Sequence, residues 1–114
     1  MRFMMIVKAV ENSGPPPKEL MEAIEKIAEE ATKAGEMIES GGLASTATGT
    51  RVRLSGGKLN VTDGPFTEAK ELVGGFAIIQ AGSKQEAIEH TKYFLQHAGG
   101  GETEIRQLYE APPR

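Results

Sequence analysis

Residues 2–8, Arg2-Phe3-Met4-Met5-Ile6-Val7-Lys8, are apolar at both odd and even positions between two basic ends. Successive side chains of a strand point to opposite faces, so a run of this kind is typical of a strand that is covered on both sides. A second such run is Gly74-Gly75-Phe76-Ala77-Ile78-Ile79-Gln80. We therefore expect these two runs to be the central strands of a sheet with two apolar faces.

The segments around these two strands have either helical or extended patterns. Apolar residues recur at intervals of four, three and four within residues 17–34, which predicts an amphipathic helix there. Ser83 with Glu86 three residues later is a capping-box pattern, which predicts a second helix that ends at residues 99–101. Extended patterns cover residues 37–44, 50–54, 58–62 and 102–110, and a Gly-Gly turn joins the middle two into a hairpin.

This order of elements predicts an α+β fold, ferredoxin-like βαββαβ with an inserted β-hairpin. Both helices of that fold cover one face of the sheet. Phe3, Met5 and Val7 cannot share a face with Met4 and Ile6, so the uncovered face is apolar too, along with part of residues 76–79. Such a patch is too apolar to remain in water. We expect a second copy to cover it, sheet against sheet, as a homodimer that is free to form a higher homo-oligomer. The alternative is a hairpin that folds back over its own sheet.

The composition narrows the class of protein. The chain has 114 residues, which fits a single domain over residues 1–114, and it has no Cys, which excludes disulfides and cysteine nucleophiles. Its net charge is −3 and its basic residues are scattered, so we expect no nucleic-acid partner. The apolar run 3–7 is too short to cross a membrane and lacks the flanks of a signal peptide. We therefore expect a cytoplasmic protein without a membrane partner.

Asp63 is the most site-like residue, because it is the only Asp among 16 acidic residues and precedes Gly64-Pro65-Phe66. Its short side chain can accept hydrogen bonds from backbone N–H groups just downstream, so it can cap a turn into a short helix over residues 67–71. The other interpretation is that Asp63 lies beside the dimer cleft as a general acid or base. The two roles compete, because a carboxylate held by backbone donors has a lowered pKa.

The block Asp63-Gly64-Pro65-Phe66, with Val61-Thr62 before it and Glu68, Lys70-Glu71 and Gly74-Gly75-Phe76 after it, resembles the DGPF domain of the YCII-related proteins. The likeness covers nearly the whole chain and includes Met4-Met5, Arg53 and Glu104-Ile105-Arg106. The resemblance implies a ferredoxin-like fold that forms a dimeric α+β barrel. Related YCII-like proteins include an enzyme that acts on chlorinated hydroxyquinol, with a His-Asp pair as its proposed site. The first His of this chain is His90, so the resemblance carries over only Asp63.

A stripe of polar residues follows the second predicted helix and consists of Glu86, His90, Tyr93 and His97. The two His residues are separated by roughly 10 Å along the helix axis, which is too far for one metal ion. We therefore expect this stripe to be a solvated outer face and predict no metal site.

Arg51 and Arg53 share one face of the predicted hairpin. They either bind an anionic ligand bidentately or pair across the strands with Lys58 or Asn60.

The hypothesis that joins these features is a small acidic or phenolic ligand bound near Asp63. The cleft would also be lined by Arg53, Gly64, Pro65, Phe66 and Phe76. In an enzyme, Asp63 would be the general acid or base and Arg53 would orient the substrate, with no cofactor implied. The alternative is a non-catalytic binding or regulatory dimer in which Asp63 only braces its turn.

Overall fold

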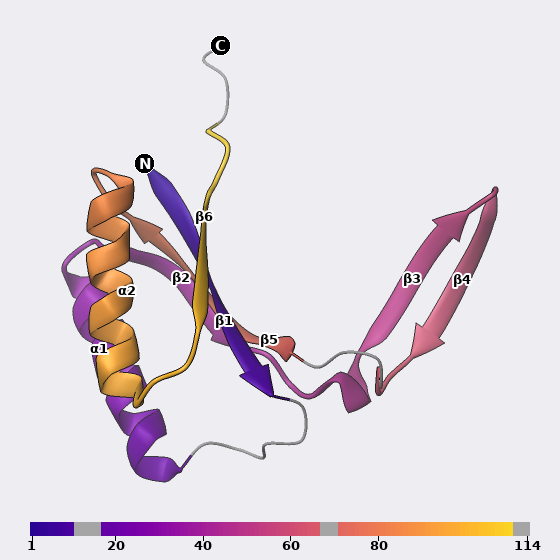
Figure 1. Ribbon diagram of the computed structural model, residues 1–114, viewed down its shortest axis with the longest axis horizontal. Coiled ribbons are helices and arrows are strands. Elements are labelled where there is room, and N and C mark those ends of the chain that lie inside the picture. Colours follow the sequence, from indigo (N-terminus) through magenta and orange to yellow (C-terminus); the bar gives the residue numbers. More distant parts are fainter. Residues whose placement is uncertain (11–16, 67–70, 111–114) are drawn as a thin grey trace.

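The computed structural model describes residues 1–10, 17–66 and 71–110, and it has the mixed α+β architecture that the sequence predicts (Figure 1). The elements are, in chain order, β1 (Arg2–Val10), α1 (Lys18–Lys33), β2 (Met37–Gly42), the 3-10 helix η1 (Thr46–Thr48), β3 (Thr50–Ser55), β4 (Lys58–Asp63), β5 (Glu71–Gln80), α2 (Lys84–Ala98) and β6 (Thr103–Gln107). The short helix predicted over residues 67–71 falls mostly outside the described residues, and Glu71 itself opens β5.

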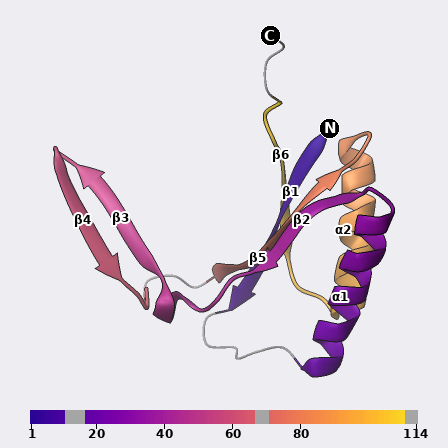
Figure 2. The ribbon, with the colours of Figure 1, turned by 180° about the vertical axis from the view of Figure 1, so that it is seen from behind.

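Four strands form one antiparallel sheet in the order β2-β5-β1-β6, so the two strands with apolar residues on both faces lie at its centre. Both helices cover the same face of this sheet (Figures 1 and 2). This strand order with two helices on one side is the ferredoxin-like arrangement. The predicted fold class and element order are therefore confirmed.

The core lies between the sheet and the helices. Phe3 and Met5 of β1 stand opposite Ile79 and Ala77 of β5, and all four side chains are at most 6% exposed. Ala87 of α2 is fully buried against them. The alternation of strand side chains thus turns the odd positions of β1 towards the helices.

The even positions of β1 form the opposite side of the sheet, which we call the open face. It contains Met4 and Ile6 of β1, paired with Ile78 and Phe76 of β5 respectively. All four side chains are partly exposed, and no helix lies over them (Figures 1 and 2). The prediction of a second apolar face without cover from the helices is therefore confirmed.

The two helices differ in how firmly they are held. At the start of α2, the Ser83 side chain accepts a hydrogen bond from the Glu86 backbone N–H at 3.1 Å, and the Glu86 carboxylate accepts one from the Gly82 N–H at 2.9 Å. The predicted capping signal is thus confirmed, with the Glu reaching one residue further back than in the usual capping box. In contrast, no residue of α1 is buried, although the helix is amphipathic.

The hairpin of β3 and β4 forms its own two-stranded sheet and projects away from the body of the molecule (Figures 1 and 2). We call residues 50–63 the arm. Cross-strand pairing puts Val52 next to Val61 and Leu54 next to Leu59 on one face, and these four side chains are 69–71% exposed. The alternative in which the hairpin roofs its own sheet is therefore not the arrangement of this chain.

Candidate functional site

The turn at Asp63 joins the end of the arm to the body. Asp63 is the last residue of β4 and pairs with Thr50, whose hydroxyl donates a 3.0 Å hydrogen bond to the Asp63 carboxylate. The next residue, Gly64, donates its backbone N–H to the Gly49 carbonyl at 2.8 Å. The two chain segments at the base of the arm are thus clamped together, and Asp63 itself is exposed to solvent.

Gly64 is required by a close approach of two backbones. A Cβ atom at this position would lie 1.7 Å from the Thr46 carbonyl oxygen, well inside van der Waals contact. The Arg51 guanidinium lies over the Phe66 ring, 3.9 Å from its centroid, as a cation–π contact. The Gly64-Pro65 peptide bond is cis. Much of the motif around Asp63 therefore serves to build the base of the arm.

The structure does not bring the predicted ligand-binding residues into one cleft within a single chain. Arg53 pairs with Asn60, as one interpretation expected, and lies on the face of the arm opposite to Asp63. Phe76 belongs to the open face of the main sheet, where its ring lies next to Gly41. Gly64, Pro65 and Phe66 remain together at the turn. A ligand role for these residues stays a prediction.

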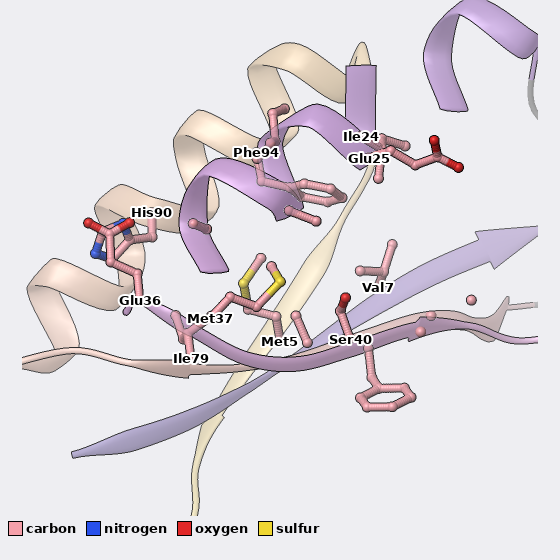
Figure 3. Close-up of a pocket in the computed structure, with 18 of the residues that line it drawn as sticks. Met5, Val7, Ile24, Glu25, Glu36, Met37, Ser40, Ile79, His90 and Phe94 are labelled. Atoms are coloured by element: carbon pink, nitrogen blue, oxygen red, sulfur yellow. The ribbon is translucent and has the colours of Figure 1, made fainter. Parts of the chain in front are cut away.

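A cavity of about 660 Å³ lies elsewhere, between the two helices and the sheet. Its walls are largely apolar, and the sulfur-containing side chains of Met5 and Met37 lie between α1, α2 and the strands (Figure 3). Ile24 of α1 and Phe94 of α2 close it from the helix side (Figure 3). This volume falls in the range of small-molecule sites, roughly 300–1,000 Å³.

One end of the cavity is polar, because His90 and Glu36 meet there (Figure 3). His90 Nδ1 lies 3.7 Å from a Glu36 carboxylate oxygen, and His90 Nε2 lies 3.5 Å from a Glu86 carboxylate oxygen. His90 Nε2 is buried without a hydrogen-bond partner in the described structure, since 3.5 Å is ion-pair range rather than a formed hydrogen bond. Nε2 is thus a polar atom that the surrounding protein covers without satisfying its hydrogen-bonding capacity.

The expectation that the whole polar stripe of α2 is a solvated outer face is wrong for His90. Its side chain is only 28% exposed and lines the cavity. Its neighbour Tyr93 also borders the cavity but is 47% exposed, and its ring contacts that of His97 in a tilted arrangement with centroids 4.1 Å apart. Among the described residues, no group of three or more acidic or His side chains could hold a metal ion.

The cavity is the feature that sequence reasoning missed, although small residues on both of its walls were a usable signal. Ala28 and Ala31 of α1 and Ala34, the residue after it, line one side, and the pairs Gly41-Gly42 and Gly74-Gly75 line it from the sheet. Small side chains on both walls leave space between the helix and the sheet. Larger residues such as Ile24 keep the helix from moving closer to the sheet, so the space stays open. Periodicity alone gives no measure of that separation.

Comparison with known proteins adds the following findings. A family model described as the YCII-related domain matches residues 1–109. Among solved structures, this chain is similar to 5-chloro-2-hydroxyhydroquinone dehydrochlorinase from Burkholderia phenoliruptrix AC1100 in complex with 2,5-dihydroxybenzoquinone, with 19% identity over 97% of this chain and 96% of that one and a TM-score of 0.46. A search of the curated proteins finds no match. In the described part of the chain, no helix is long and apolar enough to cross a membrane.

Proposed function

The chain belongs to the YCII-related family, and we propose that this member binds a small phenolic molecule in the cavity between its helices and its sheet. The observation that carries the proposal is the buried His90 Nε2 without a hydrogen-bond partner at the polar end of an otherwise apolar cavity. A phenol matches both parts, because its ring suits the apolar walls and its hydroxyl can bond the imidazole. Methionine sulfur atoms also make favourable contacts with aromatic rings.

The charges around His90 favour a phenol over a carboxylic acid. Glu36 and Glu86 flank the imidazole, and no Lys or Arg is found among the described residues that line the cavity. A carboxylate in this position would face two like charges without a described cation to offset them. The earlier hypothesis of an acidic or phenolic ligand thus narrows to the phenolic class at this site.

The same geometry assigns different roles to His90 and Asp63. His90 lies between two carboxylates, and a neutral imidazole with its Nδ1–H turned towards Glu36 would offer Nε2 as the acceptor of a hydrogen bond from the phenolic hydroxyl. Asp63 is exposed at the base of the arm and accepts a hydrogen bond from Thr50, so we assign it to bracing the turn. The proposal is therefore binding with a hydrogen bond to His90, without a catalytic role for Asp63.

The proposed state of the protein is a homodimer. Met4, Ile6, Phe76 and Ile78 form an apolar open face that the helices of the same chain do not cover. Covering such a face with a second copy removes apolar surface from water in both chains, and a two-fold arrangement closes the assembly.

The binding proposal is tested by isothermal titration calorimetry with 4-ethylphenol, 4-ethylbenzoate and ethylbenzene as probes. We expect 4-ethylphenol to bind most tightly, and His90→Leu to weaken it about tenfold, the equivalent of one hydrogen bond. His97→Gln is the matched control, because His97 lies on the same helix but does not line the cavity. Equal affinity of the wild type and His90→Leu for 4-ethylphenol, or preference for the benzoate, would refute the proposed site.

A further inference from the structure

The cavity between the helices and the sheet is longer than one phenol ring. Glu36, directly before β2, and Ser40 within β2 both line it, and four residues of extended chain cover roughly 13 Å. On the helix side, Glu25 and Ala34 line it nine residues apart, which is also roughly 13 Å along a helix. A phenol bonded to His90 occupies about half of this length, so the other half has room for a substituent.

The end of the cavity opposite His90 is also polar. Figure 3 shows Glu36 and His90 at one end and Glu25 at the other, with the Ser40 side chain pointing from β2 towards α1. Glu25 and Ser40 are exposed residues, whereas His90 Nε2 is covered by the protein. The cavity therefore has a covered polar end, an apolar middle and a polar mouth.

The charge of Glu25 is not balanced within the described part of the chain. Glu25 forms no ion pair there, whereas two other acidic residues of α1 do, Glu22 with Lys18 at 4.0 Å and Glu29 with Lys33 at 3.2 Å. The helix positions three and four residues from Glu25 are all non-basic, and they are Met21, Glu22, Ala28 and Glu29. The described lining of the cavity includes two further acidic residues but no Lys or Arg. The mouth of the cavity is therefore negative and favours a cation.

We propose that the ligand of this cavity is a phenol with a protonated amine at the end of a short para chain, its hydroxyl at His90 and its ammonium near Glu25 and Ser40. This inference rests on the proposed phenol site and names the class of molecule that the site takes. An ammonium group has three donors, and the Glu25 carboxylate and the Ser40 hydroxyl both accept hydrogen bonds. Its charge stays at the mouth, where water still reaches it, so the complex avoids the cost of burying an ion.

The length of the cavity sets the length of the chain that carries the amine. A hydrogen bond of about 2.8 Å at each end of a roughly 13 Å cavity leaves roughly 8 Å between the hydroxyl oxygen and the amine nitrogen. An extended 4-(2-aminoethyl)phenol has this separation, with two carbons between the ring and the nitrogen. The ring then lies in the apolar middle of the cavity, where the Met5 and Met37 side chains can contact it.

Two other tails fit the same length but not the same charge. A carboxylate at the mouth would face Glu25 with no cation in the described lining to offset the repulsion. An ethyl group would add apolar contact but leave Glu25 and Ser40 without a donor from the ligand. The negative mouth therefore selects the amine.

The experiment compares three probes of similar size by isothermal titration calorimetry at pH 7 with the full-length chain. They share the phenol ring and differ in the tail, and they are 4-(2-aminoethyl)phenol, 4-ethylphenol and 4-hydroxyphenylacetate. We expect the amine to bind about fivefold more tightly than 4-ethylphenol, the value of one partly exposed ion pair, and the acetate to bind most weakly. Raising the salt concentration from about 0.05 M to about 0.5 M should reduce the advantage of the amine, because salt screens charges at the mouth.

Two single variants of α1 test whether this preference comes from Glu25. Glu25→Gln removes the charge but keeps the shape, so it should lower the affinity for the amine to that for 4-ethylphenol and leave the affinity for 4-ethylphenol unchanged. Glu29→Gln is the matched control, since Glu29 lies on the same helix, pairs with Lys33 and does not line the cavity. It should retain the preference for the amine. Binding of 4-ethylphenol shows in each variant that the cavity is still formed.

The outcomes separate this inference from the proposed phenol site. If neither 4-ethylphenol nor the amine binds, both proposals are wrong. If 4-ethylphenol binds and the amine binds no more tightly, or if Glu25→Gln keeps the full preference for the amine, the phenol site stands and the cationic tail is wrong. A preference for the amine that Glu25→Gln removes and Glu29→Gln retains is the result we expect.

Discussion

Replacing Gly64 with Ala tests the reasoning about the base of the arm. The new Cβ would lie 1.7 Å from the Thr46 carbonyl oxygen, whereas ordinary contact begins at 3.4 Å. The two backbones would have to separate by roughly 1.5 Å. That movement breaks the hydrogen bond from Gly64 to Gly49 and strains the one between Thr50 and Asp63. Neither the Gly64 backbone nor the Thr46 carbonyl can move away without shifting both chain segments at the base of the arm.

The expected cost follows from these contacts. Two weakened hydrogen bonds contribute about 0.5–1.5 kcal/mol each, and forced repacking adds about 1–3 kcal/mol. We therefore expect the free energy of unfolding to fall by about 3 kcal/mol, which lowers the melting temperature of a chain of this length by about 12 °C.

The assay is thermal and urea unfolding followed by circular dichroism, with Gly42→Ala as a matched control. A Cβ at Gly42 would meet no atom within 4 Å and its φ is not positive. Ala at such a position reduces the freedom of the unfolded chain, so the control should be neutral or more stable by up to about 1 kcal/mol. If Gly64→Ala melts at the same temperature as Gly42→Ala, the close approach of the two backbones is not a constraint on this fold.

Two further predictions concern the cavity and the edge of the sheet. Ala28→Leu on α1 should fill part of the cavity and raise the free energy of unfolding by about 0.5–2 kcal/mol. The same variant should no longer bind 4-ethylphenol in calorimetry. A loss of stability would mean that α1 already packs tightly against the sheet. Glu104 has its pKa lowered from the ordinary 4.5, chiefly by the hydrogen bond and charge of Arg106 and secondarily by Lys8. The unfolded chain therefore binds more protons as the pH falls below about 4.5, and the stability from this carboxylate is lost as the pH falls through its folded pKa. Glu104→Gln should flatten the acid limb of urea unfolding measured from pH 6 to 3, and parallel curves for the two proteins would contradict this assignment.

Much of the fold could be predicted because it depends on local rules. Apolar residues on both faces identified the central strands, and the pattern of Ser83 with Glu86 identified the start of α2, where the structure has the corresponding hydrogen bonds. The Gly56-Gly57 turn also predicted the hairpin. Each of these signals depends on residues that are close in sequence, so tertiary packing had little opportunity to override it.

The candidate site was less predictable, and for two different reasons. That Arg53 and Asp63 lie on opposite faces of the hairpin could have been predicted from the sequence. A two-residue turn at Gly56-Gly57 pairs Asp63 with Thr50, so Asp63 shares a face with Val61. The surroundings of His90 could not be predicted, since Glu36 comes from a distant part of the sequence. How far α1 stands from the sheet is decided by packing between layers, which no local pattern reports.

The arm also has a consequence for colloidal behaviour. β3 and β4 pair only with each other in the described structure, so no third strand covers either outer edge of the arm, which carries apolar side chains. An exposed strand edge of this kind can pair with strands of other molecules and so lead to aggregation. The basic residues Arg53 and Lys58 lie on this hairpin, and positive charges on exposed strands disfavour pairing with another copy. These cations therefore act as gatekeepers, and neutralising them would shift the chain from ordered assembly towards precipitation.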